Sequence, residues 1–441
     1  MNILFVHNNF PAQFRNLATF LARDPTTTIA AIGSSTAMPM RGVRLIKYIL
    51  PEANVVDTHP FARRFDLECR RAEQVLYGLS TLTSTGFRPD IIFAHPGWGE
   101  TLPLRTMFPH ARLLVYCEFY YGSHQRDLEF DPEFPTTGLD GHIALQLKNA
   151  TTLLALEDCD LGISPTKWQK STFPEHYRSK IDVFHEGINV DIAKPHPGAV
   201  LTLPSGRKLN TTDEVVTYVA RNLEPVRGYH IFMRALPSIL ARRPNAEIII
   251  IGGDGTSYGA APHAGINWKS IFLKEVESRI DLRRVHFLGR VPYHTYINTL
   301  QVSSAHVYLT YPFVLSWSLL EAMSTGCVVI ASETPPVQEM IDGKNGVLVP
   351  FFDVEQLSDR VVEALKHPSR YRSMRDAARQ FVKETFDADK ICVPRLVSTL
   401  RGDESILPSP RTTGFWPGRK RKPLEPIQNL LESDVIPLRG A

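Results

Sequence analysis

Short apolar runs alternate with amphipathic segments along the first part of the chain. The runs expected to form strands are Asn2–His7, Thr28–Ile32, Ile91–Ala94, Leu113–Cys117, Leu161–Ser164 and Ile181–Phe184. Helices are expected between several of them, at Ala12–Arg23, Phe61–Ser84 and His142–Glu157. Strands that alternate with helices indicate a parallel sheet covered by helices on both faces.

The alternation restarts after residues 194–212, a stretch without periodicity that is rich in Pro and Gly and is interpreted as a linker. Strands are expected at Val215–Val219, Ala246–Ile251, Val285–Leu288, Val307–Thr310, Val328–Ala331 and Val347–Val349. Helices are expected at Tyr229–Arg242, Trp268–Ile280, Tyr293–Ser303, Ser316–Ser324, Val354–Leu365 and Tyr371–Thr385. The pattern predicts an α/β protein with two Rossmann-like, doubly wound domains at 1–193 and 213–375. A helical segment at 376–400 and a Pro-rich basic tail at 401–441 follow.

Composition and charge are typical of a soluble globular protein. Hydrophobic residues make up 43% and charged residues 22% of the 441 positions, and the formal net charge is +3. The tail carries seven Lys or Arg against five Asp or Glu, so the rest of the chain is nearly neutral. A neutral body has no electrostatic footprint for nucleic acid, which is therefore not an expected partner.

Several features favour a cytoplasmic location. The five cysteines form no C-x-x-C pair, which argues against a zinc module or a disulfide scaffold. The N-terminal sequence has neither the basic start nor the long apolar stretch of a signal peptide. Residues 291–320 carry no Asp, Glu, Lys or Arg, but their prolines argue against a membrane span. Arg63, Arg64, Arg70 and Arg71 are a candidate peripheral contact with anionic lipid, with a solvated helix face as the alternative.

Two arginines follow the first strand of the second domain. The motifs G-x-G-x-x-G, Walker A and G-x-S-x-G are missing from the sequence. Instead, Arg221 and Arg227 lie six residues apart, directly after Val215–Val219. Ligands bind at the carboxyl ends of strands in doubly wound sheets, and a guanidinium can hold a phosphate through two parallel hydrogen bonds. The arginines are therefore candidates for binding an anion, with two surface residues flanking a turn as the alternative.

The segment Pro312–Ala331 contains the strongest signal for a nucleotide. Ser316 is a suitable N-cap for the helix that follows, and Gly326 is suited to end it. Free amides and the positive dipole end make a helix N-terminus a ready site for a diphosphate. Glu321, little more than one turn further on, is placed to accept hydrogen bonds from ribose hydroxyls. An ordinary surface glutamate is the alternative.

This segment resembles the nucleotide-binding segment of the family-4-type retaining glycosyltransferases, also called group 1 glycosyltransferases. Further similar segments are Asp90–Gly99, Ile163–Thr166, His185–Asp191, Arg221–Gly228, Gly289–Val291 and Gly343–Val349. The resemblance covers roughly residues 1–400 in the expected order, which is more specific than any single motif.

The resemblance implies a GT-B fold, in which two domains face a central cleft. The first domain would bind the acceptor and the second a nucleotide-diphosphate sugar of the UDP or GDP type. The implied catalytic residues are His95, against the donor sugar, and Arg221 and Arg227, on the diphosphate. The donor contacts are Gly253, Asp254, Gly289, Arg290, Val291, Phe313, Leu315, Ser316, Trp317, Ser318, Leu319 and Glu321. Neither a metal nor a cofactor is expected, and the acceptor is a glycan, a lipid or a small molecule.

Candidates on the acceptor or phosphate side are less closely tied to the family. Asn8, Asn9 and Phe10 stand where the family has a glycine-rich loop. Gly97 and Trp98 belong to the His95 segment, and Trp98, Glu118 and Tyr120 are candidates for lining an acceptor cleft, with core packing as the alternative.

Two further positions bear on the function. Phe313 occupies the place of an acidic residue that contacts the donor sugar in the family, so donor identity stays open. Asp158-Cys159-Asp160 matches the D-x-D of metal-dependent glycosyltransferases and is interpreted as a chance match. The expected function is transfer of a sugar with retention of anomeric configuration. A nucleotide-sugar epimerase and a non-catalytic nucleotide-sugar-binding protein are the alternatives, and the oligomeric state is left open.

Overall fold

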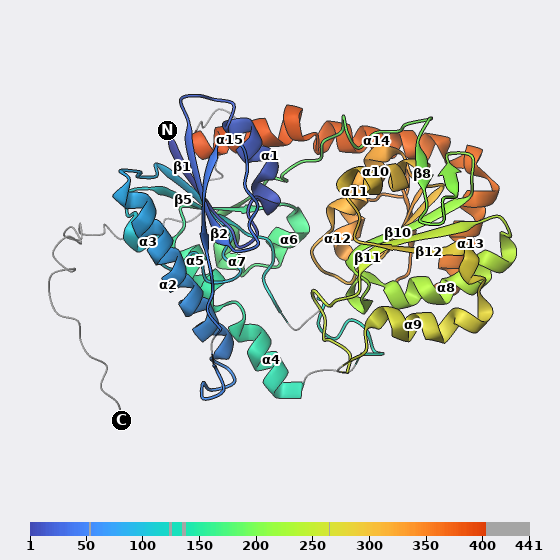
Figure 1. The fold of residues 1–441 in the computed structure, drawn as a ribbon, viewed down its shortest axis with the longest axis horizontal. Coiled ribbons are helices and arrows are strands. Elements are labelled where there is room, and N and C mark those ends of the chain that lie inside the picture. The colour runs from blue at the N-terminus through green and yellow to red at the C-terminus, as the bar shows by residue number, and fades with distance from the viewer. Residues whose placement is uncertain (53, 123–125, 135–137, 264, 403–441) are drawn as a thin grey trace. The chain divides into compact units, whose positions relative to one another are not determined.

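The computed structural model describes residues 1–52, 54–122, 126–134, 138–263 and 265–402. Its first sheet has seven parallel strands in the order β3-β2-β1-β4-β5-β6-β7 (Figure 1). They are β1 (Asn2–Val6), β2 (Thr28–Ser34), β3 (Val43–Tyr48), β4 (Ile91–Ala94), β5 (Arg112–Tyr116), β6 (Leu161–Ser164) and β7 (Ile181–Val183). The strand order reverses between β1 and β4, where Ile3 pairs with Ile91, and such reversals open a crevice at the carboxyl ends of the strands.

Helices cover both faces of this sheet. On one face, α2 (Arg63–Ser84), α3 (Leu104–Met107) and α5 (Ala150–Asp158) contribute to an apolar cluster with the sheet. On the other face, α1 (Arg15–Leu21) packs beside α15 (Val393–Arg401), the last helix of the described chain. Shorter elements are η1 (Ala12–Phe14), α4 (Gly138–Leu147), α6 (Lys167–Ser171) and α7 (Glu175–Arg178).

Two expectations for this half are wrong. The strand β3 was not predicted, because its alternating sequence VRLIKY lies at the sheet edge and buries only Tyr48 fully. The single helix expected at His142–Glu157 is divided into α4 and α5. The Asn149 side chain accepts a hydrogen bond from Tyr121 N (2.9 Å) and donates one to Tyr121 O (2.9 Å) at the break.

The second sheet has six parallel strands in the order β12-β11-β10-β13-β14-β15. They are β10 (Val215–Asn222), β11 (Glu247–Gly253), β12 (Val285–Gly289), β13 (Ala305–Tyr308), β14 (Val329–Ser332) and β15 (Val347–Val349). α8 (Tyr229–Arg242), α9 (Trp268–Val276) and α13 (Val354–Lys366) cover one face. α10 (Tyr293–Val302), α11 (Trp317–Thr325) and α14 (Arg372–Thr385) cover the other. Two doubly wound parallel sheets confirm the predicted fold class.

The remaining short elements of this half are α12 (Pro335–Gln338), 3-10 turns and one π-helical turn. The 3-10 turns are Pro225–Arg227, Glu277–Arg279, Leu282–Arg284 and Pro368–Tyr371, and the π-helical turn is Ala388–Cys392. Helix α14 runs continuously through residues 375 and 376, where a segment boundary was expected.

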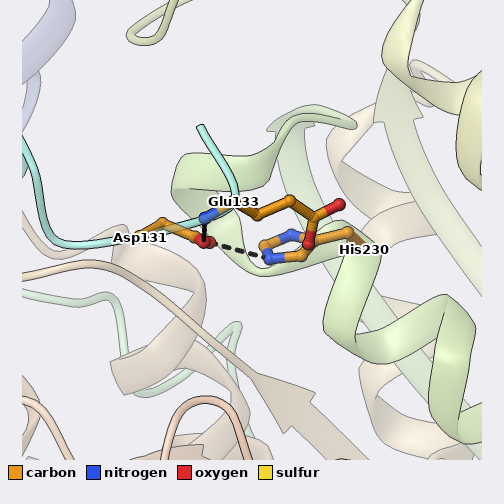
Figure 2. Close-up of side chains that lie close together, drawn as sticks. All are labelled: Asp131, Glu133 and His230. Atoms are coloured by element: carbon orange, nitrogen blue, oxygen red, sulfur yellow. Dashed lines mark hydrogen bonds and ion pairs between the residues drawn. The ribbon is translucent and has the colours of Figure 1, made fainter. Parts of the chain in front are cut away.

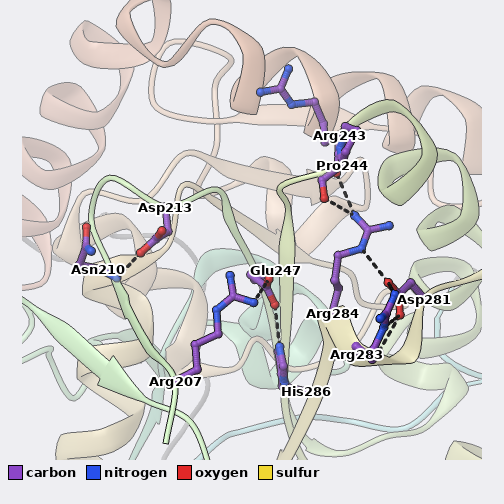
Figure 3. A network of polar contacts seen from close by, with 10 residues as sticks. All are labelled: Arg207, Asn210, Asp213, Arg243, Pro244, Glu247, Asp281, Arg283, Arg284 and His286. Atoms are coloured by element: carbon purple, nitrogen blue, oxygen red, sulfur yellow. Dashed lines mark hydrogen bonds and ion pairs between the residues drawn. The ribbon is translucent and has the colours of Figure 1, made fainter. Parts of the chain in front are cut away.

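Residues 200–210 form a packed hairpin within the stretch 194–212, where an irregular linker was expected. β8 (Val200–Thr202) and β9 (Lys208–Asn210) pair in antiparallel fashion and bury Leu201 and Leu209. Arg207, in the hairpin turn, forms an ion pair with the buried Glu247 of β11 (2.5 Å), whose other oxygen lies 2.7 Å from His286 Nε2 (Figure 3). The alternation of Leu with polar residues on such short strands is too brief to stand out in the sequence.

The predicted basic tail lies outside the described residues, apart from Arg401 and Gly402. Among the helices that are described, none is both long enough and apolar enough to cross a membrane.

Candidate active site

The start of α11 has the features of an anion site. The Ser316 hydroxyl caps the helix by accepting a hydrogen bond from Ser318 N (3.3 Å), and the Tyr308 hydroxyl accepts one from Ser316 N (2.8 Å). Gly326 ends the helix in the left-handed conformation (φ 77°). The predicted N-cap and C-cap are therefore both present, and the positive end of the helix dipole lies at Trp317.

Not every residue predicted at this helix end faces outward. Trp317 is partly exposed, and its indole N–H donates to the carboxylate of Glu186, a residue of the first half of the chain. Leu319 is completely buried in the core between α11 and its neighbours, and Leu315 packs against the same core. The Leu319 side chain is thus unavailable as a donor contact, because the helical period turns it towards the sheet.

The two predicted arginines have different surroundings. Arg227 is buried, and its guanidinium donates to Thr310 Oγ1 (2.9 Å) and to the carbonyl of Val314 (2.8 Å), just before α11. Rings of Tyr258 and Phe313 lie 5.0 and 5.6 Å from it. Arg221 is exposed and forms no hydrogen bond or ion pair within the described part of the chain. One arginine is thus held in place, and the other is free to meet a ligand.

Phe313, the substitute for the family's acidic residue, faces other aromatic rings. Its side chain is 3% exposed, and its ring centroid lies 4.9 Å from that of Phe119 and 5.0 Å from that of Tyr258. Phe119 comes from the first half of the chain. A hydrogen bond to a sugar hydroxyl at this position is impossible, and the ring instead adds an apolar wall beside Arg227.

Glu321 is 8% exposed and is held by two tyrosines of α10. Tyr293 and Tyr296 donate their hydroxyl protons to its two carboxylate oxygens, at 2.7 and 2.6 Å. Burial raises the pKa of Glu321, and the two hydrogen bonds act in the opposite direction. Sequence reasoning missed both tyrosines, which carry no motif.

A hollow of about 430 Å³ opens at the carboxyl ends of β11 and β12. Four predicted donor residues, Gly253, Asp254, Gly289 and Arg290, line it together. A Cβ atom on Gly253 would lie 2.5 Å from Asn222 Oδ1 and 2.8 Å from Arg290 Nε, and the Arg290 side chain donates to Asn222 (3.2 Å). Val291 follows the lining residues in the chain and is partly buried.

The hollow also contains a cation that the sequence did not reveal. Lys269 Nζ lies 3.3 Å from Asp254 Oδ1 and 4.9 Å from the ring centroid of Phe287, and both partners line the hollow. Lys269 belongs to no motif. It lies fifteen residues after Asp254 in the chain, so the sequence did not indicate that the two side chains meet.

His95 lies at the end of a chain of hydrogen-bonded side chains. Its Nδ1 accepts from Gly97 N (3.1 Å), so its proton lies on Nε2, 3.4 Å from Glu118 Oε2. Gln13 donates to Glu118 Oε1 (2.7 Å) and lies 2.9 Å from His7 Nε2. Burial lowers the pKa of His7 to about 3, so this imidazole is neutral. Burial opposes ionisation of Glu118, but its contacts with His95 and Gln13 outweigh burial and lower its pKa.

The loop that carries His95 is closely packed. The Trp98 ring stacks on His95 with centroids 4.7 Å apart, and a Cβ atom on Gly97 would lie 2.9 Å from His95 Cε1. Arg64 and Arg71 of α2 donate to the carbonyls of Gly97 (3.1 Å) and Trp98 (2.6 Å).

The contacts of the α2 arginines bear on the candidate lipid contact. In addition to the bonds of Arg64 and Arg71, Arg70 pairs with Asp66 (2.7 Å), and Arg63 donates to the carbonyl of Thr58 (3.1 Å). All four guanidinium groups thus bind partners within the chain, and the peripheral lipid contact stays a prediction.

Of the first-loop candidates, Phe10 is wrong. It is completely buried, with its ring 6.1 Å from that of Phe5 in the core of the first sheet. Asn9 donates its N–H to His7 Nδ1 (2.9 Å) and accepts from Thr36, and Asn8 is partly buried with its carbonyl bound to Ser34 N. Tyr120 packs on Phe173 at 5.8 Å. The apolar Phe10 was drawn into the candidate set only by its position in the loop.

A segment of the first half is fastened to α8 of the second half. Asp131 Oδ2 lies 2.9 Å from His230 Nε2 (Figure 2). It also accepts from the Tyr311 hydroxyl (2.7 Å), and Glu133 pairs with Arg234. Among the described residues, Asp131, Glu133 and His230 are the group whose spacing suits a metal. Tyr311 and Arg234 already engage these carboxylates, so we interpret the group, with Tyr311 and Arg234, as a clasp between the two halves.

The D-x-D sequence lies apart from these groups. Asp160 Oδ2 accepts from Leu113 N (2.8 Å) and from Arg105 (2.8 Å), and Arg105 also binds the carbonyl of Asp158. These contacts join β5 and β6 and give Asp160 a structural role.

The arrangement defines a class of protein: two doubly wound sheets, with a capped helix, a buried arginine and a buried glutamate at the strand ends of the second. Residues 25–193 match the family model described as "Glycosyl transferase family 4 group", and residues 203–381 match "Glycosyl transferases group 1". The chain belongs to the group 1, family-4-type glycosyltransferases.

The curated relatives include mannosyltransferases and D-inositol 3-phosphate glycosyltransferases. One is "GDP-mannose-dependent monoacylated alpha-(1-6)-phosphatidylinositol monomannoside mannosyltransferase" of Corynebacterium glutamicum, 27% identical over 45% of this chain and 50% of the relative. Another is "GDP-mannose-dependent alpha-(1-6)-phosphatidylinositol monomannoside mannosyltransferase" of Mycobacterium tuberculosis, 24% identical over 70% of this chain and 76% of the relative. The chain thus spans half of the first and three quarters of the second.

Solved structures share the fold at low identity. A sucrose-phosphate synthase from Thermosynechococcus elongatus has a TM-score of 0.68 at 17% identity, over 91% of this chain and 100% of that one. Anabaena HepE in complex with UDP and glucose has a TM-score of 0.60 at 16% identity, over 91% and 100%. These likenesses establish the GT-B fold.

Proposed function

We propose that this protein transfers a hexosyl group from a nucleoside-diphosphate sugar, GDP-mannose in the first instance, to a hydroxyl of an acceptor, with retention of configuration. The observation that carries the proposal is Arg227. Its buried guanidinium is bound by neutral acceptors, the Thr310 hydroxyl and the Val314 carbonyl, beside the start of α11. Because none of the described carboxylates forms an ion pair with it, its positive charge is available to a diphosphate.

The proposed reaction breaks the bond between the anomeric carbon and the diphosphate oxygen. Negative charge then develops on the leaving diphosphate, and fixed cations and dipoles aimed at that charge are the largest catalytic contribution expected. Arg227, Arg221 and the amides at the start of α11 would supply them without a metal. His95 would lie against the sugar, and the acceptor hydroxyl would attack on the same face, its proton passing to the departing diphosphate oxygen.

The choice of GDP-mannose rests on the names of the two mannosyltransferases, and the acceptor class is a lipid or glycan hydroxyl on the same ground. The hollow at β11 and β12 would hold the base, and Glu321 the ribose. A location in the cytoplasm or at its membrane face, where nucleotide sugars would be met, is part of the same proposal.

The test combines binding and turnover. Thermal unfolding is measured with GDP, UDP, GDP-mannose and UDP-glucose, where a ligand at 100 times its Kd stabilises by about 2.7 kcal/mol. The shift is expected with the GDP ligands and is expected to be lost in Glu321→Ala. A shift of the unfolding midpoint with the UDP ligands alone would indicate a uridine nucleotide as the donor. No shift with any of the ligands would refute the nucleotide site.

Turnover separates the proposal from its alternatives. Arg221→Ala is expected to lower kcat by about 10²- to 10³-fold, the usual effect of removing one transition-state donor. Its unfolding midpoint should not change, since the Arg221 side chain has no hydrogen-bond or ion-pair partner among the described residues. Arg283→Ala, at an exposed arginine bound to Asp281, is the matched control. Binding without transfer to any acceptor would indicate a non-catalytic protein, and a free epimerised sugar an epimerase.

A further inference from the structure

Glu321 is a buried carboxylate with no cation among its hydrogen-bond partners in the described chain. Glu68 is paired with Arg64, and Glu247 with Arg207, so each has a cation. The two oxygens of Glu321 accept only from the hydroxyls of Tyr293 and Tyr296, among the described residues. Neutral donors orient a carboxylate without neutralising its negative charge.

The number of bonds leaves room for a ligand. A carboxylate has about four lone-pair positions, two on each oxygen. Each oxygen of Glu321 receives one tyrosine hydroxyl, at 2.7 and 2.6 Å, which leaves one position open on each. Two adjacent open positions match two neighbouring hydroxyl donors, as in the 2′,3′-diol of a ribose.

The two tyrosines link the carboxylate to the hollow at β11 and β12. They lie three residues apart on α10, which places both on one face of the helix, and their ring centroids are 5.8 Å apart. Tyr293 is the first residue of α10 and follows directly on the turn that begins with Gly289 and Arg290, which line the hollow. Tyr293 is 48% exposed, whereas Tyr296 packs against the core between α10 and α11. One short segment thus positions both the hollow and the carboxylate.

We propose that Tyr293 and Tyr296 are positioning residues for the nucleoside ribose. They hold the carboxylate of Glu321 so that its open lone pairs accept the 2′- and 3′-hydroxyls, and they thereby make the site selective for ribonucleotides over deoxyribonucleotides. The proposal rests on the proposed function, because it requires a nucleoside diphosphate beside α11. It adds the residues that determine selectivity for the sugar of the nucleotide.

The experiment measures Kd by calorimetry for GDP, 2′-deoxy-GDP and 3′-deoxy-GDP, or for the uridine series if UDP gives the thermal shift. Wild-type protein is expected to prefer the ribonucleotide by 10-fold or more, the usual effect of a hydrogen bond to a charged group. Tyr296→Phe and Tyr293→Phe are expected to weaken ribonucleotide binding by about 10-fold and to bring the ratio between ribo- and deoxynucleotide close to one.

Tyr77→Phe is the matched control, because Tyr77 also donates to a carboxylate, that of Glu73, on the exposed side of α2. It should leave all three Kd values unchanged. If Tyr296→Phe disturbs the core and fails to fold, the half-exposed Tyr293→Phe still gives the answer.

Three results distinguish the possibilities. If the ratio between ribonucleotide and deoxynucleotide affinity falls close to one in the tyrosine variants, the proposal is supported. An equal loss of affinity for all three nucleotides, or no loss, overturns it and leaves the proposed function standing. Failure of the wild-type protein to bind any nucleoside diphosphate refutes the proposed function itself, and with it the ribose assignment.

Discussion

The clasp between Asp131 and its partners makes a quantitative prediction for the variant Tyr311→Phe. Asp131 is 4% exposed and accepts from Tyr311 (2.7 Å), from His230 (2.9 Å) and from Glu133 N (3.0 Å). The Tyr311 ring also packs on Phe130 and Phe351, at 5.0 and 5.2 Å. Phenylalanine keeps this ring packing and removes only the hydroxyl, so the variant isolates one hydrogen bond to a buried carboxylate.

The expected cost is about 1.5–3 kcal/mol of unfolding free energy at pH 7, the range for hydrogen bonds to charged groups. Burial opposes ionisation of Asp131, but the hydrogen bonds from His230 and Tyr311 outweigh it and lower the pKa below the ordinary 3.8. A carboxylate with a depressed pKa stabilises the fold fully above its unfolded pKa and loses that contribution as the pH falls through the folded value. The difference between wild type and Tyr311→Phe should therefore shrink below about pH 3.8.

Urea unfolding followed by tryptophan fluorescence, at pH values from 7 to 3, measures this difference. Trp268 is a suitable reporter, since its ring lies 5.3 Å from that of Phe134 in the same segment as Asp131. Tyr77→Phe again serves as the control, because its partner Glu73 is on the surface. An unchanged unfolding free energy at pH 7, or a difference that grows as the pH falls, would refute the role given to Asp131.

Two substitutions test packing. Phe10→Ala should lower the unfolding free energy of the first half by about 3–5 kcal/mol, because the ring is completely buried. Asn8→Ala is the control in the same urea experiment. An equally small change in both variants would contradict the burial of Phe10. Gly228→Ala should lower the thermal midpoint, since Gly228 has φ 67° and an added Cβ would lie 2.4 Å from Leu309 Cβ. A midpoint equal to that of wild type would contradict this close approach.

The regular elements were the most predictable part of the protein. The bounds of β4, β6, β15 and α8 agree with those expected from the apolar pattern, because a fully buried strand or an amphipathic helix shows its period within a few residues. The edge strand β3 and the hairpin of β8 and β9 were missed. Their residues alternate over only three to six positions, and their burial depends on neighbours that the local pattern does not contain.

The residues of the candidate site also divide into those that the sequence predicted and those that it missed. Ser316, Glu321 and Arg227 were found because a helix start after a parallel strand is a local feature with a known use. Tyr293, Tyr296 and Lys269 were missed, since each acts through a residue that is distant in sequence. Phe10 was included wrongly, because a position in a loop does not tell whether the side chain faces the sheet.

The sequence by itself determined most of the strands and helices, the two doubly wound halves and the family, because hydrophobic period and local motifs are properties of neighbouring residues. The tertiary structure alone decided which side chains meet. It brought Tyr293 and Tyr296 to Glu321, placed Asp131 against His230, and surrounded Phe313 with aromatic rings. The contacts from Asp131 to His230 and from Phe119 to Phe313 join segments 99 and 194 residues apart, and these two form only when both sheets are folded.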